Sequence, residues 1–75
     1  MITIRVIDEN TGRPVENAEV GIIIDEFFRM GSPRNEYTDG NGEADMDTDP
    51  GKERVFVNGR QVYSGYISSF QRVYI

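Results

Sequence analysis

Histidine and cysteine are both absent from this chain of 75 residues. Without cysteine there is no disulfide bond and no thiolate metal site. Without histidine the chain lacks the usual acid/base group at neutral pH and the commonest nitrogen ligand of metals. A Ser-His-Asp or Cys-His site is impossible within this sequence, so we expect the protein not to be an enzyme. The alternative is a carboxylate pair such as Asp45 and Asp47, but no feature of the sequence predicts a cleft around them.

Long apolar runs and basic clusters are missing as well. The longest apolar run, residues 21–24, is far too short to span a bilayer, so we expect no membrane insertion. No charged segment followed by an apolar one opens the chain, so the sequence predicts no signal peptide. The 8 Lys and Arg residues oppose 13 Asp and Glu residues and form no basic run. Because nucleic-acid binding depends largely on basic phosphate contacts, we expect no nucleic-acid partner.

Apolar residues recur mostly at every second position, and no segment sustains a helical period. The first segment shows the pattern, with Ile2, Ile4 and Val6 on one face and polar residues between them. Seven such segments are separated by turn formers about every eight to twelve residues, which is typical of an all-β sandwich. The chain has no linker or internal repeat, so we expect residues 1–75 to form a single domain.

Asn58-Gly59 is the strongest turn signal in the chain. Both residues readily take the positive φ of a type I′ hairpin turn. Such a hairpin places Val55 opposite Val62. It also places Phe56 opposite Gln61.

A weaker turn signal at Ser68-Ser69 predicts a second hairpin, with Ile67 opposite Phe70. With both hairpins in register, one face carries mostly aromatic side chains: Phe56, Tyr63, Ile67, Phe70 and Tyr74. The other face carries mostly branched aliphatic side chains: Val55, Val57, Val62, Tyr66, Val73 and Ile75.

One face of a sheet in a two-layer sandwich is buried, so one of these two faces should be partly exposed. The aliphatic face suits the core, and we therefore predict that the aromatic face is exposed and binds a partner. Two alternatives are open. Individual tyrosines could simply lie flat on the surface, or a bulge at Gly65 could swap the alternation.

Two turn motifs carry a family resemblance. The first strand ends at Asp8 and is followed by Thr-Gly-Arg-Pro-Val at residues 11–15 and Asn-Ala-Glu-Val at residues 17–20. The second motif is Thr-Asp-Gly-Asn-Gly at residues 38–42, and Pro50-Gly51 precedes a later strand. In this order and spacing the motifs resemble those of carboxypeptidase regulatory-like domains, which belong to the transthyretin-like (prealbumin-like) superfamily.

This resemblance covers most of the chain and implies a seven-stranded, antiparallel, Greek-key β-sandwich. It also implies a non-catalytic accessory module, often extracellular or on the cell surface, attached to peptidases, surface proteins or transport receptors. The superfamily's hydroxyisourate hydrolase and iron-dependent dioxygenases depend on histidines, which this chain lacks. Two departures are the short chain and Ala44, where the family usually has an aromatic residue. An immunoglobulin-like sandwich is the alternative fold.

The acidic residues are concentrated, because 5 of the 13 lie within residues 38–51. A helix-loop-helix calcium loop that starts at Asp39 needs Gly at its sixth position and a bidentate Glu at its twelfth. The chain has Ala44 and Pro50 at these positions, so the motif fails.

A structural turn explains the same stretch better. Gly40 and Gly42 are predicted to take positive φ, and the strand that follows buries Ala44 and Met46 while its carboxylates face solvent. Neighbouring carboxylates on one side of a strand repel each other. The alternative is therefore a weak calcium site on the acidic strand at residues 39–49.

Residues 26–34 combine apolar and basic side chains: Phe27, Phe28 and Met30 with Arg29 and Arg34. Aromatic, Met and Arg residues are enriched in protein interfaces, so we predict that this segment contacts a partner. The alternative is that one of the two phenylalanines folds under the segment and closes the small core.

The leading hypothesis is a non-catalytic accessory module with a structural or protein-interaction role. The residues predicted to bind the partner are Phe27, Phe28, Met30, Phe56, Tyr63, Phe70 and Tyr74. The expected partner is a protein, either another domain of a larger chain or a second copy. No cofactor is expected. The alternative is a ligand-binding module that holds calcium on the acidic strand or carbohydrate on the aromatic face.

Overall fold

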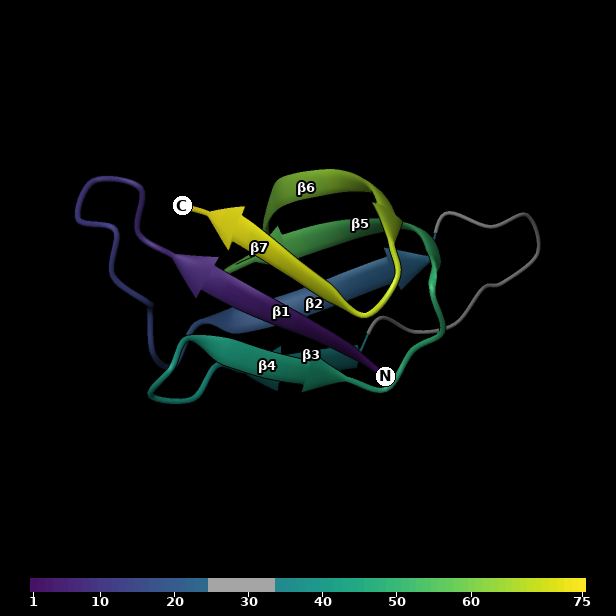
Figure 1. The fold of residues 1–75 in the computed structure, drawn as a ribbon, viewed down its shortest axis with the longest axis horizontal. Helices are drawn as coiled ribbons and strands as arrows, with labels where there is room; N and C mark the ends of the chain where they lie inside the picture. The colour runs from purple at the N-terminus through teal and green to yellow at the C-terminus, as the bar shows by residue number, and fades with distance from the viewer. Residues whose placement is uncertain (25–33) are drawn as a thin grey trace.

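The computed structural model describes residues 1–24 and 34–75. These residues form seven β-strands in two sheets that lie one over the other (Figure 1). The strands are β1 (Ile2–Ile7), β2 (Glu19–Ile24), β3 (Arg34–Tyr37), β4 (Glu43–Met46), β5 (Gly51–Val57), β6 (Arg60–Ile67) and β7 (Phe70–Tyr74). This part of the chain contains no helix, and so no helical segment there could cross a membrane. The predicted all-β, two-sheet class is confirmed.

Sheet A has three strands in the order β4-β1-β7, and sheet B has four in the order β3-β2-β5-β6. The pairs within sheet B are antiparallel, and so is the pair of β1 with β4. In contrast, β1 and β7 run parallel. The prediction of a purely antiparallel sandwich is therefore wrong for sheet A.

The parallel pair arises because the chain changes sheets at Ser68-Ser69 instead of closing a hairpin there. The carbonyl oxygen of Ser69 accepts a hydrogen bond of 2.9 Å from the Thr3 backbone nitrogen, which starts β7 against β1. The predicted pairing of Ile67 with Phe70 is thus wrong. Ile67 is 1% exposed in the core, whereas Phe70 is 43% exposed on the surface.

The hairpin between β5 and β6 turns as predicted. Both turn residues have positive φ, 52° for Asn58 and 83° for Gly59. Asn58 also ties the turn to β2, because its backbone nitrogen donates to the Glu19 oxygen and its Oδ1 accepts from the Glu19 nitrogen. The predicted pair of Phe56 with Gln61 is confirmed.

A β-bulge between Val55 and Phe56 changes the register beyond this pair. Val55 lies opposite Tyr63, not opposite Val62 as predicted. A bulge gives one strand an extra residue and so shifts which side chains share a face. Tyr63 consequently lies on the face of Val55 and packs against the core.

The hydrophobic core lies between the sheets and follows the predicted alternation. β1 buries Ile2, Ile4 and Val6, each with 0% exposure, and β4 buries Ala44 and Met46 as predicted. The other core residues are Ala18, Val20, Ile22, Val55, Val57, Ile67 and Val73. Burying one Val or Ile side chain contributes roughly 1.5–3 kcal/mol, so this set supplies most of the driving force for folding.

Thr38 joins the loop after β1 to the turn between β3 and β4. Its hydroxyl donates to the Val15 carbonyl at 2.6 Å and accepts from the Ala18 backbone nitrogen at 2.8 Å. Its own backbone bonds both to Ala18 and to Asn17. We call this network, with β3 and β4, the closed side of the sandwich.

Gly42 completes the closed side. It has a φ of 75°, and its carbonyl accepts a hydrogen bond of 2.7 Å from the Val6 nitrogen. The Asp39 carboxylate caps the turn by accepting from the backbone nitrogens of Asn41 and Glu43, at 2.8 and 3.1 Å. The predicted turn is confirmed, except that positive φ occurs at Gly42 and not at Gly40.

Candidate interaction surface

The residues predicted to bind a partner are not collected on one face. Three of them lie outside the described residues: Phe27, Phe28 and Met30. Phe56 is half-buried on β5 between two buried valines, so it faces away from the core on sheet B. Tyr63 is half-buried on β6, packs against the core and donates its hydroxyl to the Tyr66 carbonyl at 3.1 Å.

Phe70 and Tyr74 are the two predicted residues that the structure brings to one exposed surface. They lie on β7 in sheet A, with 43% and 54% exposure, and they flank the buried Val73. The predicted aromatic face is therefore split between the two sheets. The bulge in the β5–β6 hairpin and the change of sheet at Ser68-Ser69 are the physical causes.

The surface that carries Phe70 and Tyr74 is the outer face of sheet A. Along each strand its residues alternate with core residues, and register pairs place them side by side. We define this face by the residues Thr3, Arg5, Ile7, Glu43, Asp45, Phe70, Arg72 and Tyr74.

Opposite charges occupy the two halves of this face. On the β7 half, Arg5 and Arg72 are neighbours in register, and the Arg72 guanidinium lies 5.9 Å from the centre of the Phe70 ring. The Nε of Arg5 is buried without a hydrogen-bond partner among the described residues. On the β4 half, the Asp45 carboxylate accepts from the Thr3 hydroxyl at 2.7 Å. The β7 half is thus basic and aromatic.

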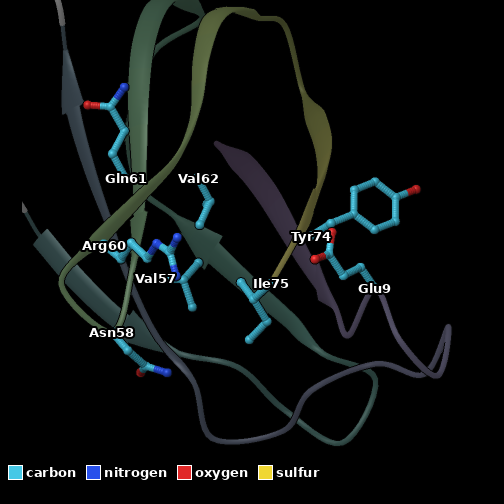
Figure 2. A pocket seen from close by; sticks show the side chains of 8 residues that line it. All are labelled: Glu9, Val57, Asn58, Arg60, Gln61, Val62, Tyr74 and Ile75. Carbon is cyan, nitrogen blue, oxygen red and sulfur yellow. The ribbon is translucent and has the colours of Figure 1, made fainter.

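A pocket of about 440 Å³ opens beside this face, between the start of β6 and the end of β7. Figure 2 shows Val57, Val62 and Ile75 pointing into it, while the ring of Tyr74 points away from it. Arg60 reaches across the β6 rim of the pocket (Figure 2). The pocket lining therefore combines these apolar side chains with polar and charged ones from Glu9, Asn58, Arg60 and Gln61.

Residues of the acidic stretch take part in the turn before β4 and in β4 itself. Asp39 caps the turn, Asp45 accepts a hydrogen bond from Thr3, and Ala44 and Met46 face the core. Within residues 1–24 and 34–75, no group of three or more Asp or Glu side chains is placed to hold a metal ion together. This arrangement adds no support to the calcium alternative.

Arg72 and Glu53 were not singled out from the sequence, although the alternation of apolar and polar residues indicates where both lie. Arg72 occupies the position between Phe70 and Tyr74 on the same side of β7. Glu53 lies in phase with Val55 and Val57, and it is 1% exposed, with the Thr48 hydroxyl donating to its Oε1 at 3.3 Å. A charged residue in phase with the core residues of a strand is thus the sequence signal for a buried charge.

The outer face of sheet A is thus an exposed surface that combines aromatic and guanidinium groups, with a pocket at its edge. On the closed side, by contrast, the polar groups of the turns are paired in hydrogen bonds with one another. Sequence and fold comparisons add no functional assignment to either region. Protein-family models, curated proteins and solved structures give no significant match to this chain.

Proposed function

We propose that this protein is a non-catalytic accessory module that binds another protein through the outer face of sheet A. The observation that carries the proposal is the row of Phe70, Arg72 and Tyr74 on β7, with both aromatic side chains about half exposed. Tyr, Phe and Arg are enriched at the centres of protein interfaces. The Arg72 guanidinium lies 5.9 Å from the centre of the Phe70 ring, so these two side chains are already close together before a partner binds.

We further propose that the fold is a Greek-key sandwich of the transthyretin-like type. Two features support this. Neighbouring strands in both sheets are often not consecutive in sequence, as in β4-β1-β7 and β2-β5. The two turn motifs at residues 11–15 and 38–42 meet in space, since Val15 bonds to Thr38 and Gly42 bonds to β1. In this arrangement the motifs stabilise turns.

The test of the proposed function is a double variant, Phe70→Ser with Tyr74→Ser. The matched control removes two other exposed tyrosines, Tyr37→Ser with Tyr66→Ser, which are 61% and 64% exposed. We expect both variants to fold, with losses of stability of about 1 kcal/mol or less, because exposed side chains contribute little.

Proteins that co-purify with the tagged wild-type chain from its native host are identified by mass spectrometry and retested in purified form by calorimetry. The Phe70/Tyr74 variant is expected to lose at least about 2 kcal/mol of binding free energy, as interface anchors do, while the Tyr37/Tyr66 control keeps it. Equal binding by both variants, or unfolding of the Phe70/Tyr74 variant, would contradict the proposal.

A further inference from the structure

β7 is an edge strand of sheet A, and some of its backbone N–H and C=O groups point away from the sheet. Among the described residues, its neighbour in sheet A is β1 on one side alone. Ser69 and Ile75 point their backbone groups at β1, because the Ser69 oxygen accepts from Thr3 and the Ile75 nitrogen donates to Ile7. Backbone groups alternate in direction along an extended strand. Those of Phe70, Arg72 and Tyr74 therefore point away from β1, toward the open edge.

One of these outward groups already has a substitute partner. The Gln71 side-chain amide donates to the Arg72 carbonyl at 2.9 Å. A side-chain N–H in this place imitates the backbone N–H that a neighbouring strand would supply. An incoming strand would replace this local bond with its own.

The charges beside the edge define the side chain that an added strand should carry. Arg72 lies on the outer face with Arg5 next to it, and Glu43 is on the far side of Arg5. The position across the open edge from Arg72 therefore borders the Arg72 guanidinium, with the Arg5 guanidinium one strand further away. A carboxylate there is attracted, and a cation is repelled.

The same charges argue against a second copy of this chain as the occupant. Two copies of β7 pairing antiparallel about their midpoint would place Arg72 opposite its own equivalent. Like charges directly opposite each other destabilise a strand pair. This symmetric register is therefore disfavoured, and we take a different segment with a carboxylate opposite Arg72 as the occupant.

The pocket beside β7 accommodates the other side of such a strand. Side chains on an added strand alternate between the outer face and the core side. Those on the core side would enter the pocket of about 440 Å³ lined by Val57, Val62 and Ile75 (Figure 2). Branched aliphatic side chains would pack against these three residues, while the polar lining residues Asn58, Arg60 and Gln61 stay beside them.

We infer that β7 accepts an extended segment of a partner protein as a fourth strand of sheet A, antiparallel to β7, with Asp or Glu beside Arg72. Aromatic residues two positions before and after this acid lie on the outer face beside Phe70 and Tyr74, and aliphatic residues between them fill the pocket. This inference rests on the proposed function, because it specifies how the partner docks.

The probe is the end-blocked synthetic peptide Gly-Ser-Tyr-Val-Glu-Val-Tyr-Ser-Gly, titrated into the ¹⁵N-labelled protein. Its control peptide has Lys in place of Glu. We expect the Glu peptide to bind about tenfold more tightly, since the exchange turns attraction into repulsion beside Arg72. Arg72→Glu, at an exposed position, should reverse the preference.

Amide hydrogen exchange then reports the pairing directly. The amides of Phe70, Arg72 and Tyr74 should gain protection on binding, whereas those of Gln71 and Val73, which face β1, should not change. A peptide N-methylated at Glu lacks the donor for the Arg72 carbonyl and should bind at least about tenfold more weakly.

Several results would overturn the inference: no binding of the Glu peptide at millimolar concentration, equal binding of the Glu and Lys peptides, or equal binding of the N-methylated peptide. Protection of the β7 amides that rises with protein concentration alone would identify a second copy as the occupant and overturn it too. If the peptide experiments fail but the Phe70/Tyr74 variant loses its partner, the outer face of sheet A is still the binding surface, and the partner binds there without adding a strand. If the variant also keeps its partner, the proposed function fails as well.

Discussion

The two sides of this sandwich are finished in different ways. On the closed side, the network around Thr38 and Gly42 holds the loop after β1 against the turn between β3 and β4. On the opposite side, β6 and β7 are joined at Ser68-Ser69 and belong to different sheets (Figure 1). The pocket lies between the start of β6 and the end of β7 (Figure 2). We call the β6–β7 side the open side. The difference teaches that the motif-bearing turns secure one side of the fold, whereas β7 at the other side has a sheet neighbour on one edge only among the described residues.

Gly42→Ala should cause the largest loss of stability, because the new methyl group both clashes with its neighbours and strains the backbone on the closed side. A Cβ at residue 42 would lie 2.7 Å from the Val6 oxygen and 2.8 Å from the Pro14 Cβ, and the φ of 75° disfavours any side chain. Overpacking and left-handed strain together should cost about 3 kcal/mol or more. Urea unfolding measures this loss.

The matched control is Gly59→Ala in the β5–β6 hairpin. Its φ is 83°, but a Cβ there meets nothing within 4 Å, so only the backbone strain applies. That strain amounts to about 1 kcal/mol. If the two variants lost equal stability, the close approach of Gly42 to β1 would have no energetic weight.

Thr38→Val should have the next largest effect. The substitution keeps the shape of the side chain but leaves the Ala18 nitrogen and the Val15 carbonyl without their hydroxyl partner. Unsatisfied buried groups of this kind should cost about 2 kcal/mol in urea unfolding. The control, Thr3→Val, removes an exposed bond to Asp45 and should change stability by about 0.5 kcal/mol or less. Similar losses in both would show that the Thr38 network does not hold the closed side together.

The local features of the fold were predictable from the sequence. Alternation in β1 and β4 located core residues such as Ile4 and Met46, and Asn58-Gly59 located a hairpin turn. These signals depend on the side-chain period and on the conformational freedom of single residues, which neighbouring residues determine. The turn at residues 38–42 was predictable for the same reason.

The layout of the open side was not predictable, because it depends on contacts between distant parts of the chain. Ser68-Ser69 is compatible with a hairpin and with a change of sheet, and the pairing of Ser69 with Thr3 decides between them. The bulge beside Val55 likewise has no local signal. Together they determine which aromatic residues share a face, so the candidate surface needed the structure.

The most direct test compares one exposed tyrosine from each side of the sandwich. A photo-crosslinking amino acid, p-benzoylphenylalanine, replaces Tyr74 on β7 or Tyr37 on β3, which are 54% and 61% exposed. The protein is then irradiated in its native host. We expect a discrete adduct with another protein from position 74 and none from position 37. Adducts from position 37 alone, or equal adducts from both, would contradict the assignment of binding to the outer face of sheet A.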